Sequence, residues 1–191
     1  MAKHLDQILV VDLECTCWEG ETPPGQTGEV IEIGICLLDA NTLTRSAKEA
    51  ILVRPERSQV SPFCTRLTTL TQEQVDGGIP FAQACQKLRK EYKAGDRTWV
   101  SYGDFDRRQF ERQCQETGVY YPFGKTHLNV KNLLSIALNE PYELSMDKAL
   151  ARLNLPLEGT HHRGVDDAWN IAQLLALLLG KLRAANHQQE S

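Results

Sequence analysis

Three aliphatic runs near the N-terminus most constrain how this chain can fold. They cover residues 7–13, 29–39 and 47–53, and each is rich in Ile, Val and Leu. Runs of this length and composition are typical of buried strands. Because only loops separate them, consecutive antiparallel pairing is the simplest arrangement. The N-terminal third of the chain therefore predicts an antiparallel meander.

From Ser61 onward the pattern changes to helix starts and helical periodicity. A short helix is expected to open at Thr71 and to close at Gly77, and Pro80 is expected in the first turn of the next helix. Strands that come first and then alternate with helices indicate an α/β fold with a mixed sheet. The remaining expected elements are helices over 81–92, 106–117, 131–138, 146–153 and 165–182, and strands over 98–102 and 127–130.

The size and composition of the chain favour one globular domain. It has 191 residues, 41% of them hydrophobic and 24% charged. We expect residues 1–183 to form this domain and 184–191 to form a polar tail. Apolar runs fall short of the roughly 20 residues that span a bilayer, and the first one is too short for a signal peptide. The expectation is a cytoplasmic protein without membrane contact, whose six cysteines are reduced.

The net charge does not decide whether the partner is a nucleic acid. The chain carries 21 Lys and Arg against 25 Asp and Glu, a net charge of −4. An acidic balance argues against a general nucleic-acid coat protein. If four acidic residues bind divalent cations, however, the remaining acidic and basic residues balance. A specific nucleic-acid enzyme is therefore compatible with this composition.

Two acidic residues end the first predicted strand. Asp12 and Glu14 are two positions apart, so their side chains lie on one face while Leu13 points to the other. Two like charges at the end of an apolar strand cost roughly 1 kcal/mol or more unless a cation neutralises them. Many strands also end in solvated acids, so this pair alone leaves both interpretations open.

Two further acidic sites lie at helix starts. Asp104 and Asp106 stand where a strand gives way to a helix, a place where acids are common because they complement the helix dipole. Asp167 follows two histidines and has the helical spacing of the apolar residues after it, so it faces inward. A buried acid needs a partner, which indicates a site rather than a solvated surface.

These acidic motifs occur in the order found in one enzyme family. They are Asp12-x-Glu14, Phe105-Asp106, and His162 with Asp167 five positions later. The chain resembles the DnaQ-like DEDDh 3′–5′ exonucleases, and within them the Eri-type subgroup of the three-prime histone mRNA exonuclease and KapD-like proteins. The resemblance extends over residues 7–182. Other matching phrases are DLECTC (12–17), EVIEI (29–33), VRPE (53–56), SPFC (61–64), LTTLTQEQV (67–75) and GVDD (164–167).

The resemblance implies an RNase H-like fold and a set of site residues. It implies that Asp12, Glu14, Asp106 and Asp167 bind two ions of Mg²⁺ or Mn²⁺ and that His162 is the general base. It further implies that Phe63, Leu67 and Phe105 flank the terminal base. The alternative is that Phe63 and Leu67, four residues apart, only anchor a helix to the core.

The choice between neighbouring aspartates follows the family pattern. Asp106 is preferred over Asp104 because the family's acid follows an aromatic residue, as Asp106 follows Phe105.

The chain departs from the family pattern in one motif. The family's Thr-Gly-Ile is Thr68-Thr69-Leu70 here, so the turn after Leu67 is expected to differ. We expect no additional nucleic-acid-binding domain within these 191 residues, so the stem-loop specificity of some members of the subgroup is not expected here.

The choice between neighbouring histidines follows the same pattern. The family has a small residue two positions after its histidine. Gly164 stands there when the histidine is His162, so His162 and Asp167 are preferred over His161 and Asp166.

The chemistry of phosphodiester hydrolysis explains this residue set. Two metal ions about 3.5–4 Å apart stabilise the attacking and leaving oxygens, and carboxylates favour Mg²⁺ or Mn²⁺ over Zn²⁺. Cys15 and Cys17 lack the spacing of a zinc site. Histidine, with an ordinary pKa of about 6.5, can accept a proton near neutral pH.

The predicted function is thus a metal-dependent 3′–5′ exonuclease. It would release nucleoside monophosphates one at a time from single-stranded 3′ ends. We favour RNA over DNA as the substrate and expect little sequence preference, because stacking tolerates any base. The alternative is a non-catalytic regulator or adaptor that keeps the fold. Five basic residues could contact phosphates, although scattered bases are also typical of solvated surface: Arg107, Arg108, Arg112, Lys125 and Lys131.

Overall fold

A mixed six-stranded sheet forms the centre of the molecule. The computed structural model describes residues 4–189. The strand order of the sheet is β4-β3-β2-β1-β5-β6. The pairs β1–β2 and β2–β3 are antiparallel, whereas β5 pairs parallel to β1, β6 to β5 and β4 to β3. The predicted meander and mixed sheet are confirmed. The strands are β1 (His4–Cys15), β2 (Val30–Asp39), β3 (Arg45–Arg54), β4 (Ile79–Pro80), β5 (Arg97–Ser101) and β6 (His127–Asn129).

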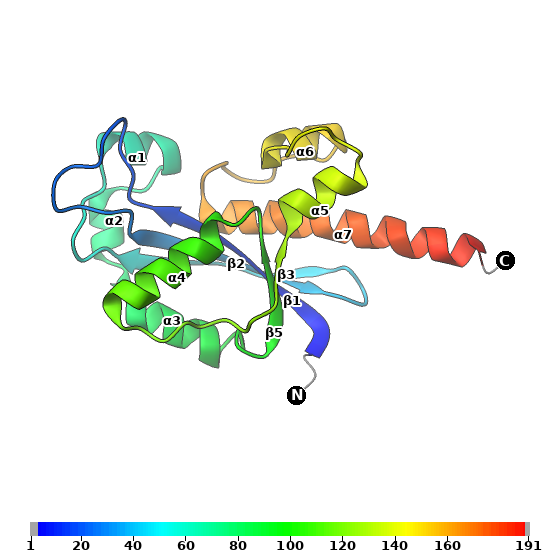
Figure 1. Cartoon of the computed structure of the whole chain (residues 1–191), viewed down its shortest axis with the longest axis horizontal. Coiled ribbons are helices and arrows are strands. Elements are labelled where there is room, and N and C mark those ends of the chain that lie inside the picture. Colours follow the sequence, from blue (N-terminus) through cyan, green and yellow to red (C-terminus); the bar gives the residue numbers. More distant parts are fainter. Residues whose placement is uncertain (1–3, 190–191) are drawn as a thin grey trace.

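Helices cover both faces of the sheet (Figure 1). Helices α3 and α4 pack on one face, and α5, α6 and α7 pack on the other. Helices α1 and α2 lie near the end of β1 that carries the acidic residues. The helices are α1 (Pro62–Thr68), α2 (Gln72–Asp76), α3 (Phe81–Lys90), α4 (Phe105–Thr117), α5 (Val130–Ala137), α6 (Met146–Arg152) and α7 (Gly164–Gln189).

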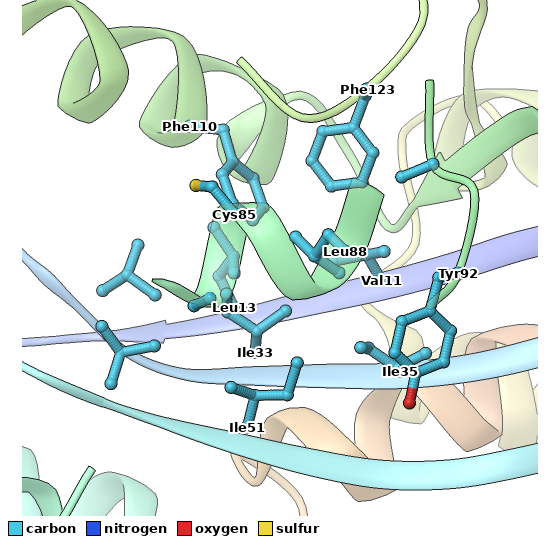
Figure 2. Packing of buried hydrophobic residues seen from close by; sticks show 14 of the residues in the cluster. Val11, Leu13, Ile33, Ile35, Ile51, Cys85, Leu88, Tyr92, Phe110 and Phe123 are labelled. Atoms are coloured by element: carbon cyan, nitrogen blue, oxygen red, sulfur yellow. The ribbon is translucent and has the colours of Figure 1, made fainter. Parts of the chain in front are cut away.

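The alternation of side chains along β1 determines which face each acid shares. Leu9, Val11 and Leu13 belong to the core under α3 and α4, whereas Val10 packs with the helices of the opposite face. Figure 2 shows Val11, Leu13 and Leu88 among the buried residues of the core under α3 and α4. Asp12 therefore lies on the α7 side of the sheet, as its position relative to Val10 predicts.

The structure differs from the predicted elements at the end of α7 and at Pro80. Helix α7 extends to Gln189, beyond the expected end at 182, because its last turns contain Ala, Arg and Gln, which are good helix formers. Pro80 precedes α3 and also ends the two-residue strand β4, where the edge of the sheet tolerates proline.

Within residues 4–189, no helix combines the length and apolar composition that a membrane span requires.

The turn after α1 has a left-handed backbone at Thr69. Thr69 ends α1 in the left-handed region with φ of 64°, and its N–H donates to the Thr65 carbonyl. Glycine is favoured in this conformation, so a threonine here carries some strain. Thr69 thus adopts a left-handed conformation at the position where the family pattern has glycine.

Candidate active site

The acidic end of β1 opens into a pocket with a volume of about 680 Å³. Asp12 and Glu14 project into it from one face of the strand, and Asp167 reaches it from the first turn of α7. Carboxylate oxygens of these three residues lie within 4.8 Å of one another. Residues more than 150 positions apart in the sequence thus form one acidic cluster.

Asp106 joins this pocket from the first turn of α4. Its carboxylate accepts a hydrogen bond of 2.9 Å from the Leu13 N–H, which ties the start of α4 to β1. Asp106 is 4% exposed. Asp104 instead pairs with Arg107 at 3.4 Å and does not line this pocket. The geometry therefore brings Asp106, and not Asp104, to Asp12 and Glu14.

The two aspartates at the start of α7 point in different directions. Asp166 forms an ion pair of 2.6 Å with Lys48 and accepts a hydrogen bond from the Thr160 N–H. Asp167 is 5% exposed and faces the acidic cluster. The helical spacing that predicted an inward-facing Asp167 matches this arrangement.

Both histidines before α7 line the pocket, but they contact Asp167 in different ways. The His161 Nδ1 atom lies 3.1 Å from an Asp167 carboxylate oxygen, whereas His162 donates its backbone N–H to Asp167. Their rings stack with centroids 3.9 Å apart. His162 has a φ of 63°, an uncommon conformation for a non-glycine residue and one often found at functional sites.

Burial gives the acidic cluster its unusual electrostatics. Desolvation, followed by the charges of the neighbouring carboxylates, raises the pKa of Asp12 well above its ordinary range and raises the pKa of Glu14 to about 9. Desolvation also raises the pKa of Asp106 to about 7 and that of Asp167. Because these neighbouring carboxyl groups repel one another when ionised, a cation bound between them would stabilise their ionised forms.

The chemistry of the donors fits a hard divalent cation. Mg²⁺ and Mn²⁺ prefer carboxylate oxygens as ligands, whereas thiolate sulfur is typical of zinc sites. Cys15 and Cys17 line the same pocket, but burial raises the pKa of the Cys17 thiol to about 12 and that of Cys15 well above its usual value. Protonated thiols are poor metal ligands, so the oxygens are the ligands that this pocket offers.

These pKa shifts predict how stability depends on pH without metal. Glu14 and Asp106 hold protons more tightly in the folded state, so their contribution is greatest below their ordinary pKa values of 4.5 and 3.8. This contribution to the free energy of unfolding is lost as the pH rises through about 7 for Asp106 and through about 9 for Glu14. In EDTA we expect the Tm to fall between about pH 5 and pH 9, and saturating Mg²⁺ to remove most of this fall.

Thermal unfolding followed by circular dichroism measures this effect, with Glu14→Gln as the control variant. The amide cannot ionise, so the variant should show a shallower fall in EDTA than the parent chain. Equal pH dependence of the two proteins would contradict the assigned cause.

The pocket wall beside the acidic cluster is apolar and open. Phe105 is 59% exposed and lines the pocket together with Leu67. Phe63, one turn before Leu67 on α1, lies beside Arg66 and outside the pocket lining. Helix α1 is anchored by the buried residues Cys64 and Thr68 rather than by Phe63 and Leu67. The structure thus brings Leu67 and Phe105, but not Phe63, to the site.

Sequence patterns did not predict a role for Glu32 on β2. It stands opposite Glu14 in the β1–β2 register and is fully buried. Its carboxylate accepts hydrogen bonds from Arg163 and Gly164, directly after His162. An acid within an aliphatic strand is the sequence signal that could have marked it.

Comparisons with known proteins agree on one family. A family model described as Exonuclease (RNase_T) matches residues 9–175, which include all five predicted metal-binding and general-base residues. The human protein named "3'-5' exoribonuclease 1" is 32% identical over 189 residues, which cover 92% of this chain and 53% of the relative. The Drosophila melanogaster "3'-5' exonuclease Snipper" is 27% identical over 194 residues, which cover 90% of this chain and 69% of the relative.

Solved structures extend the comparison. The nuclease domain of 3'hExo, described as a DEDDh family member bound to rAMP, superposes with a TM-score of 0.78 at 30% identity. The match covers 94% of this chain and 95% of that one. This chain spans about half the length of the human exoribonuclease that it matches.

Proposed function

The chain belongs to the Exonuclease (RNase_T) family, as an Eri-type DEDDh member with an RNase H-like fold, and from this premise we propose that it is a metal-dependent 3′–5′ exonuclease. Membership confirms the resemblance and the fold predicted from the sequence, and it implies dependence on a divalent metal. The substrate we propose is single-stranded nucleic acid with a free 3′ end, RNA in preference to DNA. The product is a nucleoside monophosphate.

One observation carries this proposal. Carboxylates from β1, α4 and α7 meet in one pocket, and the exposed Phe105 ring lies in the wall of the same pocket. The cluster offers ligands for two ions of Mg²⁺ or Mn²⁺, and the ring offers a stacking surface for a terminal base. The adaptor alternative has no comparable observation in its favour.

The proposed mechanism assigns each side chain a task. Asp12, Glu14, Asp106 and Asp167 would hold the two ions, which when bound stabilise the attacking and leaving oxygens of the phosphodiester. His162 lines the pocket, and burial followed by the neighbouring His161 lowers its pKa. The imidazole is therefore neutral near neutral pH and able to take a proton from the attacking water.

An end-labelled oligonucleotide tests the proposal. With Mn²⁺, a 5′-labelled single-stranded RNA should give a ladder that shortens one nucleotide at a time, and a 3′-labelled RNA should release labelled mononucleotide first. The same sequence as DNA should be degraded more slowly. Full-length material under all divalent ions would support the adaptor, and internal cuts would indicate an endonuclease.

Phe105 is expected to contribute to substrate binding. Base–aromatic stacking is worth about 1–3 kcal/mol, so Phe105→Ala should raise KM for short RNA by about 5- to 150-fold. Phe105→Trp should keep KM near the parent value. Tyr120→Ala, which removes another exposed ring outside the pocket, is the control. Steady-state kinetics on a labelled oligonucleotide measure both constants, and an unchanged KM for Phe105→Ala would refute the stacking role.

A further inference from the structure

The buried carboxylate of Glu32 accepts hydrogen bonds from two consecutive residues, Arg163 and Gly164. Oε1 accepts from Arg163 Nη2 at 2.8 Å, and Oε2 accepts from Arg163 Nε at 3.3 Å and from the Gly164 N–H at 2.7 Å. Glu32 is 0% exposed, and the Arg163 side chain is 26% exposed. A charge buried this deeply is tolerated because the guanidinium fork and the amide satisfy it.

This segment is the one that carries the proposed general base and one proposed metal ligand. Arg163 directly follows His162, and Gly164 begins α7 three residues before Asp167. Strand β2 and the segment also touch through their backbones. A Cβ built on Gly34 would lie 1.8 Å from the Gly164 carbonyl oxygen, so the approach leaves no room for a side chain.

We propose that Glu32 and Arg163 form a positioning pair that holds His162 and Asp167 against the end of β1. The inference rests on the proposed function and assigns the pair no contact with substrate. Both Glu32 carboxylate oxygens accept hydrogen bonds from Arg163 or Gly164, so Glu32 is not among the proposed metal ligands. Outer partners that orient ligands typically affect metal affinity or activity by about 10- to 100-fold.

A purely electrostatic role makes a different prediction. Glu32 and Arg163 carry opposite charges near the acidic cluster, so neutralising each would change cation affinity in opposite directions. A positioning pair makes the same prediction for both variants, because removing either partner releases the same segment. The direction of the two effects therefore distinguishes the roles.

The test compares Glu32→Gln, Arg163→Gln and the double variant. We expect each single variant to lower kcat by about 10- to 100-fold with KM changed less than about threefold, and to weaken Mn²⁺ binding in calorimetry of the whole chain. The double variant should be no worse than the more damaging single one, since both remove one interaction. Arg163→Lys, which keeps the charge, should recover part of the loss.

Glu49→Gln is the matched control. Glu49 lies on the neighbouring strand β3 and pairs with Lys87 at 2.8 Å, away from the pocket. Its kcat and Mn²⁺ affinity should stay at the parent values.

Three results would overturn the positioning pair: parent-like kcat in folded Glu32→Gln or Arg163→Gln, opposite changes in Mn²⁺ affinity, or additive losses in the double variant. If Glu32→Gln does not fold by circular dichroism, Arg163→Gln, at a partly exposed position, carries the test. If the parent chain degrades no nucleic acid, the proposed function fails while the Mn²⁺ titrations still decide the positioning role.

Discussion

Alanine at Asp12 or at Asp167 is expected to lower kcat at least about a thousandfold while the chain stays folded. Each carboxylate lies in the cluster that would hold the ions, so its loss removes a ligand at the centre of the reaction. The fold should persist, because neither side chain contributes to the apolar clusters. The ladder assay measures turnover, and circular dichroism checks the fold.

The same substitutions should stabilise the metal-free protein. Without a cation the carboxylates of Asp106, Glu14 and Asp167 repel that of Asp12, and removing one carboxylate relieves this repulsion. We expect a higher Tm in EDTA for Asp12→Ala and a smaller gain in Tm on adding Mg²⁺. Asp104→Ala, outside the cluster, is the control and should retain turnover. Parent-like turnover by either cluster variant would refute the assignment of ligands.

His162→Ala is expected to lose about 100- to 10,000-fold in kcat, the usual contribution of a general base, while it still binds Mn²⁺. His161→Ala should stay within about tenfold of the parent, because the His161 ring contacts Asp167 and orients it without taking the proton. The comparison is demanding, since both rings line the pocket and stack on one another.

Single-turnover kinetics with saturating Mn²⁺ separate the two histidines, and calorimetry checks that each variant binds the ion. The reverse order, with His161→Ala as the inactive variant, would show that His161 is the base. Equal and small losses in both variants would remove histidine from the mechanism.

Local periodicity was sufficient to place several acids of the site. The period of two along β1 placed Asp12 and Glu14 on one face, and the helical period of α7 turned Asp167 inward. The preference for Asp106 over Asp104 came from the family pattern. In the structure the two differ in burial, a tertiary property that the helix start alone does not reveal.

Other features depend on contacts that no local pattern encodes. The partners of Glu32 are more than 130 residues away along the chain, so its role emerges only when β2 meets the start of α7. The spacing of Phe63 and Leu67 is compatible with either face of α1. Packing of Cys64 with Leu70 and Val75 turns Leu67 to the pocket and leaves Phe63 outside it.

The most direct test of the central claim is calorimetric titration of the metal-free chain with Mn²⁺ at neutral pH. If carboxylates from β1, α4 and α7 hold a pair of ions, the parent chain should take up two ions, and Asp12→Ala should lose one or both. No uptake by the parent, or the same uptake after the substitution, would contradict the shared cation site.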